Sequence, residues 1–141
     1  MRTRNAAILL SAAISALLLV ATALAQNSGW RNYNPSTETT IKGTVGEVKQ
    51  ITGRGGGLSA GTHLTVRTDK GNLQVHVGPA AWLEKQRFTF AKGDQLEVLG
   101  SKVTQAGQEI LLAREIRKDS KTLTLRNAQG IPAWSRGWRN Q

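Results

Sequence analysis

The stretch Leu73–Val103, LQVHVGPAAWLEKQRFTFAKGDQLEVLGSKV, decides the fold of this chain. It begins and ends with apolar residues that alternate with polar ones, which is the pattern of a strand with one buried face. Between these runs, Gly78 and Pro79 interrupt the first strand, and a proline suits the first turn of a helix. The stretch therefore predicts a strand, one short helix over Ala80–Phe88, and a second strand.

The strand predicted before this stretch, Glu38–Ile51, is long and irregular. Its apolar residues alternate up to Val45, but the next one is Val48, three positions later. A one-residue slip beside Gly46 is what a β-bulge produces, and a bulge bends and twists a strand. A small barrel needs such a bent first strand in order to close.

The clearest hairpin consists of Thr62–Thr68 and Asn72–Val77, with Gly71 as the permissive turn residue. The expected register places Val66 opposite Val75, so the apolar residues of both strands share one face. The polar residues then share the other face, on which the two histidines lie diagonally across the hairpin. This polar face comprises His63, Thr65, Arg67, Gln74 and His76.

The order of the remaining elements completes a fold class. Further strands are predicted at Leu96–Val103, Ile110–Arg117 and Thr122–Arg126, with Ile110, Leu112 and Ile116 pointing inward. Three strands, one helix and two more strands are the order of the OB-fold, a five-stranded Greek-key barrel. We therefore expect an all-β chain with one short helix: an OB-fold-like five- to six-stranded Greek-key barrel, plugged at one end by Trp82 and Leu83. The alternative is another small antiparallel barrel, or a meander with a helical connection.

The N-terminal residues are typical of a signal peptide. Arg2 and Arg4 precede the apolar run Ala6–Ala21, and Ala23–Ala25 has the small residues that signal peptidase recognises. We expect cleavage before Gln26, so that residues 1–25 are removed and the protein is exported to the periplasm. The alternative is an uncleaved N-terminal membrane anchor, since the apolar run is long for a signal core.

The expected mature chain is a single basic domain without cysteine. Removing 25 of the 141 residues leaves 116, which is enough for one compact core. The net charge of +10 falls to +8 when Arg2 and Arg4 are lost. Such a surface attracts anions, and for an exported protein the expected partner is an envelope protein or an anionic envelope component. We divide the mature chain into a flexible N-terminus at 26–37, the barrel at 38–126 and a Trp/Arg-rich tail at 127–141.

The barrel resembles small exported bacterial OB-fold proteins, a group that includes the BOF (YgiW-like) and DUF5666-like families. The generic part of the likeness is Gly43-x-Val45, Asp94-x-Leu96-x-Val98-x-Gly100 and the strand Ile110–Ile116. Ala113-Arg114-Glu115-Ile116 and Leu125–Trp134 resemble more closely the domain of magnetosome-associated proteins of the MamS/MamX type. Where that family carries haem it uses a Cys-x-x-Cys-His motif, which this chain lacks, so the resemblance implies an envelope module without cofactor or established activity.

The polar face of the hairpin is the first candidate site. His63 and His76 could hold a transition metal, but two ligands are too few for a closed site, and two exposed strand histidines are the more ordinary interpretation. The same face, with Thr65, Arg67 and Gln74, lies where OB-folds bind oligomers. It contains no Phe, Tyr or Trp on which bases could stack, so a nucleic acid is an unfavoured partner.

The C-terminal tail is the second candidate site, since it combines Trp134, Arg136, Trp138 and Arg139. Trp and Arg are enriched at interfaces, so the tail could contact a partner or a membrane peripherally. Alternatively Trp134 caps an open end of the barrel, and only Trp138 is exposed. No catalytic constellation is apparent. We therefore expect a non-catalytic binding or scaffold module, with a metal or small-ligand carrier and a weak nucleic-acid binder as alternatives.

Overall fold

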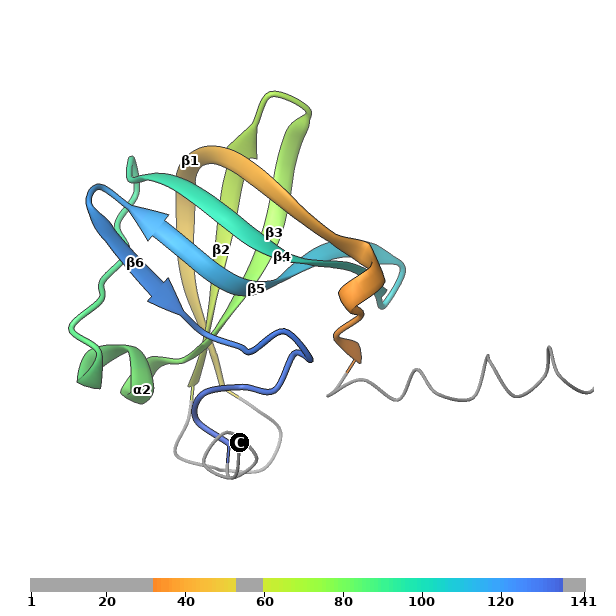
Figure 1. Ribbon diagram of the computed structural model, residues 1–141. Coiled ribbons are helices and arrows are strands. Elements are labelled where there is room, and N and C mark those ends of the chain that lie inside the picture. The colour runs from red at the N-terminus through yellow and green to blue at the C-terminus, as the bar shows by residue number, and fades with distance from the viewer. Residues whose placement is uncertain (1–31, 53–59, 136–141) are drawn as a thin grey trace, which may run out of the picture.

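The computed structural model describes residues 32–52 and 60–135, in which strands wind into a barrel beside one short helix (Figure 1). The elements are η2 (Pro35–Thr37), β1 (Glu38–Thr52), β2 (Ala60–Thr68), β3 (Gly71–Pro79), α2 (Ala80–Lys85), β4 (Gln95–Gln105), β5 (Gln108–Lys118) and β6 (Lys121–Thr124). The predicted all-β class with one short helix is confirmed. Within these described ranges, no helix has the length and apolar character needed to cross a membrane.

Closure of the barrel depends on β1 and on one parallel pairing. The sheet order is β3-β2-β1-β4-β5-β6, and β3 also pairs in parallel with β5, so five strands close on themselves and β6 extends the sheet. β1 pairs with β4 along its first half and with β2 along its second half. This is the OB-fold-like arrangement that the sequence predicts.

The bend of β1 follows from two glycines. The register with β2 shifts between Val45 and Glu47, which confirms the predicted bulge beside Gly46. At Gly43 the neighbouring backbone is so close that a Cβ atom would lie 2.4 Å from the carbonyl oxygen of Arg67. Only glycine fits there, and β1 can therefore belong to both sides of the barrel.

The register of the β2–β3 hairpin differs from the predicted one by two residues. Val66 lies opposite Leu73 rather than Val75, and Thr68 lies opposite Gly71. The two-residue turn lies one position earlier than predicted, at Asp69 and Lys70. The Thr68 hydroxyl closes it, because it accepts a hydrogen bond from the Lys70 amide at 3.2 Å and donates to the Gly71 carbonyl at 2.8 Å. A shift of two residues leaves each side chain on its predicted face.

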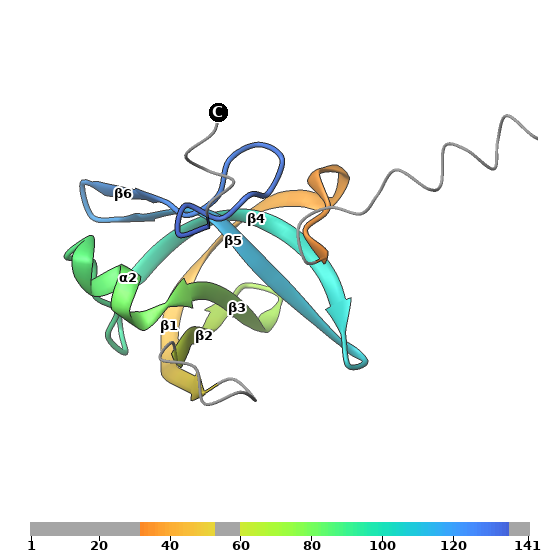
Figure 2. The ribbon, with the colours of Figure 1, turned by 90° about the horizontal axis from the view of Figure 1, so that it is seen from below.

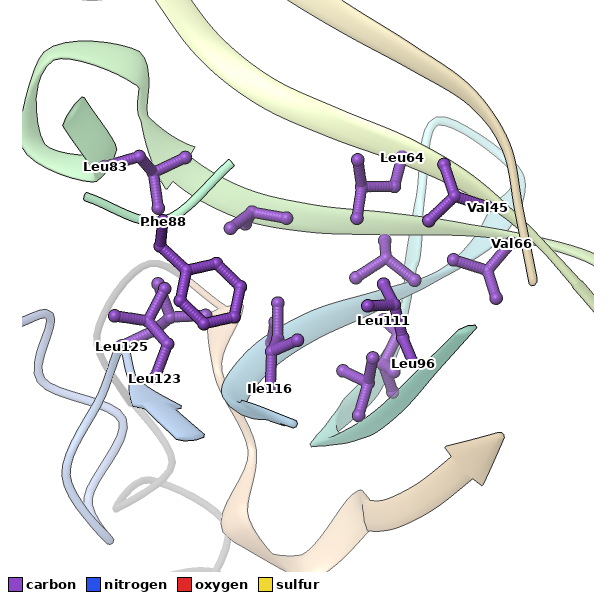
Figure 3. Packing of buried hydrophobic residues seen from close by; sticks show 14 residues of the cluster. Val45, Leu64, Val66, Leu83, Phe88, Leu96, Leu111, Ile116, Leu123 and Leu125 are labelled. Atoms are coloured by element: carbon purple, nitrogen blue, oxygen red, sulfur yellow. The ribbon is translucent and has the colours of Figure 1, made fainter. Parts of the chain in front are cut away.

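The main core lies inside the barrel (Figure 3). Its buried members are Val45, Leu64, Val66, Val75, Val77, Leu83, Phe88, Leu96, Val98, Leu111, Ala113, Ile116, Leu123 and Leu125. They come from all six strands, the helix and the segments that follow α2 and β6.

The predicted inward face of β5 is partly wrong. Leu111, Ala113 and Ile116 lie in the main core, whereas Ile110 and Leu112 lie in a second cluster with Tyr33. The cause is an irregularity in pairing with β4, where the register shifts between Leu99 and Gly100. Ile116 therefore shares a face with Leu111 rather than with Leu112.

The helix is shorter than predicted. It ends at Lys85 rather than near Phe88, because Arg87 has a left-handed backbone conformation with φ of 53°. The turn that follows sends Phe88 into the core beside Leu83. Leu83 is buried and Trp82 packs against the same core, so both predicted anchors of the plug contact it.

We expected a flexible N-terminus at residues 26–37, of which residues 26–31 lie outside the described residues. Its described part, residues 32–37, packs against the barrel, and the Tyr33 side chain is buried. The Asn34 amide donates a hydrogen bond to the buried Ser101 hydroxyl, which also contacts the Thr37 hydroxyl. Burial of one aromatic ring and two hydrogen bonds to Ser101 hold this segment against the barrel, and neither has a periodic sequence signature.

Candidate functional site

The outward side of the β2–β3 hairpin, which we call the hairpin face, consists of three directly opposed residue pairs. His63 lies opposite His76, Thr65 opposite Gln74 and Arg67 opposite Asn72. The structure thus brings together all five residues that the sequence predicts for this face: His63, Thr65, Arg67, Gln74 and His76. The Gln74 amide donates a hydrogen bond to the Thr65 hydroxyl at 2.8 Å, which joins the two side chains of this pair.

The two histidines are stacked. Their ring centroids lie 3.7 Å apart with an interplanar angle of 12°. We expected a diagonal relation, and the two-residue register shift makes it a direct one instead. Burial lowers the pKa of His63. The pKa of His76 is lowered to about 4, mainly by burial and also by the neighbouring His63 and Arg126. Both rings are therefore neutral at pH 7, and the formal charge of the hairpin face comes from Arg67.

The stacked geometry is poorly suited to one shared metal ion. The lone pair of an imidazole lies in its ring plane, so two parallel rings do not direct their lone pairs at a common point. Among residues 32–52 and 60–135, no group of three or more His, Cys, Asp or Glu side chains is placed to hold a metal. A metal at this pair would require the rings to unstack.

Of the four predicted tail residues, Trp134 is the one that the structure describes. It is half-buried and packs against the main core, and its ring lies 5.3 Å from that of Trp82. A Cβ atom on Gly78 would lie 2.7 Å from the Trp134 ring, so the glycine makes room for it at the end of β3. Arg136, Trp138 and Arg139 lie outside the described residues.

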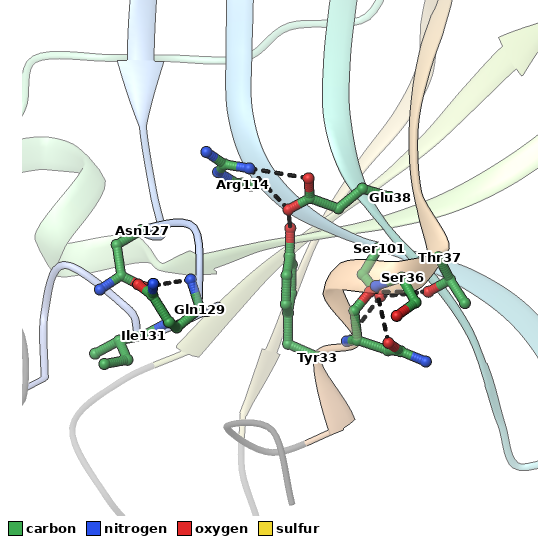
Figure 4. A network of polar contacts seen from close by, with 10 residues as sticks. Tyr33, Ser36, Thr37, Glu38, Ser101, Arg114, Asn127, Gln129 and Ile131 are labelled. Atoms are coloured by element: carbon green, nitrogen blue, oxygen red, sulfur yellow. Dashed lines mark hydrogen bonds and ion pairs between the residues drawn. The ribbon is translucent and has the colours of Figure 1, made fainter. Parts of the chain in front are cut away.

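A polar cluster that the sequence did not predict holds the segment before β1 (Figure 4). The Tyr33 hydroxyl donates a hydrogen bond to the Glu38 carboxylate, and Arg114 donates to both Glu38 oxygens at 2.9 Å. Burial and the adjacent carboxylate raise the pKa of Tyr33, and the Glu38 hydrogen bond raises that of Arg114. The Tyr33 ring also packs against Gly130, where a Cβ atom would lie 2.4 Å from it.

This cluster covers the outer side of β5. Tyr33 packs with Ile110 and Leu112, which are 4% and 7% exposed although they point away from the main core. The guanidinium of Arg126 lies 5.8 Å from the Tyr33 ring and 5.4 Å from the Trp134 ring. Tyr33 could have been suspected from the sequence only as an isolated aromatic residue in a polar segment.

Comparison with protein-family models matches residues 37–123 to the MamS/MamX magnetosome protein family. The match spans more than half of the chain and includes β1 to β5 and the hairpin face. Comparison with curated proteins finds no match. Covalent haem attachment through cysteine does not fit this chain, because its sequence has no cysteine. On the extent of the family match, the chain belongs to the MamS/MamX magnetosome protein family.

Proposed function

We propose that this chain is a non-catalytic, exported binding module of the bacterial cell envelope, and that an envelope protein binds its hairpin face. The observation that carries the proposal is the contrast between the two outer sides of the barrel. In the first half of β5 the outward residues Ile110 and Leu112 are apolar and covered by Tyr33, whereas the hairpin face presents polar pairs. Polar side chains held in fixed pairs on a rigid hairpin are suited to hydrogen bonding with a partner at low entropic cost.

The charge of the hairpin face favours a protein over a polyanion as its partner. Both histidines are neutral at pH 7, and Lys49, which lies opposite His63 on β1, forms an ion pair with Glu47 at 3.4 Å. Arg67 is exposed and has no ion pair with a described residue. One cation without an aromatic platform gives little affinity for nucleic acid.

The proposal also includes export and a more distant relationship to other families of exported proteins. The signal peptide with cleavage before Gln26 and the periplasmic location rest on the sequence pattern of residues 1–25. The order of the elements supports kinship with the BOF (YgiW-like) and DUF5666-like exported proteins. Edman sequencing of the protein recovered from the periplasm tests the export, with Gln26 expected as the first residue.

Affinity capture from envelope extracts tests the binding surface. Tagged residues 26–141, which contain every residue of both core clusters, serve as bait. An Arg67→Ala and Gln74→Ala variant removes two side chains of the hairpin face, and a Lys121→Ala and Thr122→Ala variant removes two exposed side chains of β6 as the matched control. We expect a protein that the wild type and the control retain and that the hairpin variant loses. Equal retention by all three baits would reject the hairpin face as the binding surface.

The direct opposition of His63 and His76 favours a metal or small-ligand carrier as the second candidate. Two imidazoles in contact can bind a transition metal if the rings turn, although water or a ligand must then supply the other positions. Calorimetric titration with Zn²⁺ and Cu²⁺ tests this candidate. It predicts a binding heat that His76→Ala abolishes, and the same heat in the variant, or none in the wild type, would exclude it.

A further inference from the structure

The end of the barrel opposite α2 holds an open cavity. Figures 1 and 2 show α2 at one side of the barrel and the turn between β4 and β5 at the opposite side. The cavity, of about 570 Å³, is lined by the first half of β1, the turn of the β2–β3 hairpin and residues of β4 and β5. Pockets for small molecules have volumes of about 300 to 1,000 Å³ and often lie in the mouths of β-barrels. This cavity therefore has the size and the place of a ligand site.

An ion pair from β4 and β5 lies at the rim of the barrel interior. Lys102 is directly opposite the core residue Leu111, and Glu109 precedes Leu111 by two residues. Directly opposed residues share a face of the sheet, as do residues two apart on one strand, so both charged side chains are on the inner face. The Lys102 ammonium and the Glu109 carboxylate are 3.2 Å apart. The inner face of the barrel thus ends in a pair of opposite charges.

β1 and β3 supply an apolar floor below this pair. Ile41 and Leu73 are half-buried, line the cavity and pack against the main core. Thr39 precedes Ile41 by two residues, so its side chain lies on the same inner face, nearer to the rim. Five lining residues on the inner face define what we call the barrel mouth: Thr39, Ile41, Leu73, Lys102 and Glu109.

The charges around the cavity cancel. The lining residues of both signs are Lys70, Lys102, Asp69 and Glu109. Lys42 also belongs to the lining, but it alternates with Ile41 to the outer side of β1, where it pairs with Glu97 at 3.5 Å. A simple anion or cation therefore gains little net attraction here. A ligand that carries both signs has a partner for each of its charges, so a zwitterion is the complementary chemistry.

We propose that the barrel mouth binds an amino-acid zwitterion with an apolar side chain. The ammonium and carboxylate of an α-amino acid are attached to one carbon atom, so they are about as close together as the charges of Lys102 and Glu109. The ligand carboxylate pairs with Lys102, its ammonium pairs with Glu109, and its side chain contacts Ile41 and Leu73. The two protein side chains are 40% and 60% exposed, so exchanging their screened ion pair for pairs with the ligand costs little.

This site is separate from the hairpin face. Leu73 is on the inner face of β3, whereas Gln74, the next residue, points outward and bonds to Thr65. A small ligand at the barrel mouth and a protein on the hairpin face can therefore be bound at the same time, and the two proposals stand or fall independently.

Nuclear magnetic resonance titration of residues 26–141 with L-leucine tests the proposal. We expect saturable amide shifts at the barrel mouth and a Kd on the order of 1 mM. Leucine amide lacks the carboxylate, N-acetyl-leucine lacks the ammonium and glycine lacks the apolar side chain, so each should bind at least about fivefold more weakly. No saturable shift with leucine, equal binding of N-acetyl-leucine, or shifts centred on His63 and His76 would overturn the proposal. Binding of glucose, an uncharged polyhydroxyl ligand, in place of leucine would also overturn it.

A matched pair of carboxylate variants tests the role of Glu109. Glu109→Gln should weaken leucine binding at least about fivefold, but it should not weaken the binding of N-acetyl-leucine, which has no ammonium to pair. Glu97→Gln is the control, because it removes a carboxylate that pairs with Lys42 on the outer side of the same sheet. The amide spectra of both variants show whether the fold is kept, which we expect for these surface carboxylates. Equal losses of leucine affinity in the two variants would overturn the assignment of Glu109 as the partner of the ammonium.

Discussion

The two outer sides of the barrel show how a covering segment changes what a strand can carry. On β5, the outward residues Ile110 and Leu112 are apolar and almost fully buried, because Tyr33 lies over them. On the hairpin, the outward residues are polar and form side-by-side pairs such as Thr65 with Gln74. The first side is part of the structural core, whereas the second is available for recognition. Substitutions on the covered side should therefore affect stability, and substitutions on the hairpin face should affect binding.

The largest effect is expected for Tyr33→Ala. The side chain is 2% exposed and fills the space between Ile110, Leu112 and Gly130, so its loss leaves a cavity and exposes two apolar residues. We expect the free energy of unfolding to fall by about 3 kcal/mol or more, as for other buried aromatic residues. Urea denaturation measures this. Tyr33→Phe, which keeps the ring and loses the hydrogen bond to Glu38, should cost about 1 kcal/mol. Similar small losses for both variants would mean that the covering segment contributes little.

The next effect is expected for Arg114→Met. This change leaves the Glu38 carboxylate, in a side chain that is 20% exposed, without its cation, and we expect a loss of about 2 kcal/mol. Arg117→Met on the same strand is the matched control, because Arg117 is 60% exposed and its ion pairs with Glu97 and Glu115 are 3.8 Å and 3.4 Å long. Exposed pairs are worth little, so the control should lose less than about 0.5 kcal/mol. Thermal and urea denaturation of the two variants measure both losses. Equal losses of stability would mean that the covered side of β5 contributes no more to stability than its exposed residues do.

A smaller, pH-dependent effect is expected on the hairpin face. The pKa of His76 is about 4 in the folded protein and near 6.5 when unfolded, so the unfolded chain binds more protons between these values. Stability contributed by the neutral ring is present above pH 6.5 and is lost as the pH falls toward 4. Because the ring is half-exposed and screened, we expect a loss of about 1 kcal/mol. Urea denaturation at pH 7 and pH 4.5 should show a smaller difference in His76→Gln than in the wild type. An identical difference would mean that another group titrates.

The closure of the barrel could be predicted from the sequence because its determinants are local. The slip from Val45 to Val48 marked the bulge, and the Gly78 and Pro79 break placed the helix between the third and fourth strands. Periodicity also assigned every hairpin residue to its correct face. These features depend on neighbouring residues along one strand or turn.

The remaining features depend on contacts that periodicity does not record. The Thr68 hydroxyl set the hairpin turn and brought His63 directly opposite His76. The covering of β5 needed Tyr33, which lies about 80 residues from Leu112 along the chain. A side chain that packs on the outside of a barrel obeys no strand alternation, so the second cluster had no periodic signal and Tyr33 stood out only as an isolated aromatic residue.

The smallest effect tests the comparison with matched hydroxyl deletions. Ser101 is fully buried and accepts a hydrogen bond from the Asn34 amide at 3.0 Å, so Ser101→Ala leaves a partly buried donor without its acceptor and should cost about 0.5 to 1 kcal/mol. Thr65 lies on the hairpin face, where water can replace its bond to Gln74, so Thr65→Ala should cost less than about 0.5 kcal/mol. Chemical denaturation measures both. If Thr65→Ala were the costlier change, the hairpin face would be a structural surface, and its polar pairs would no longer support a role in binding.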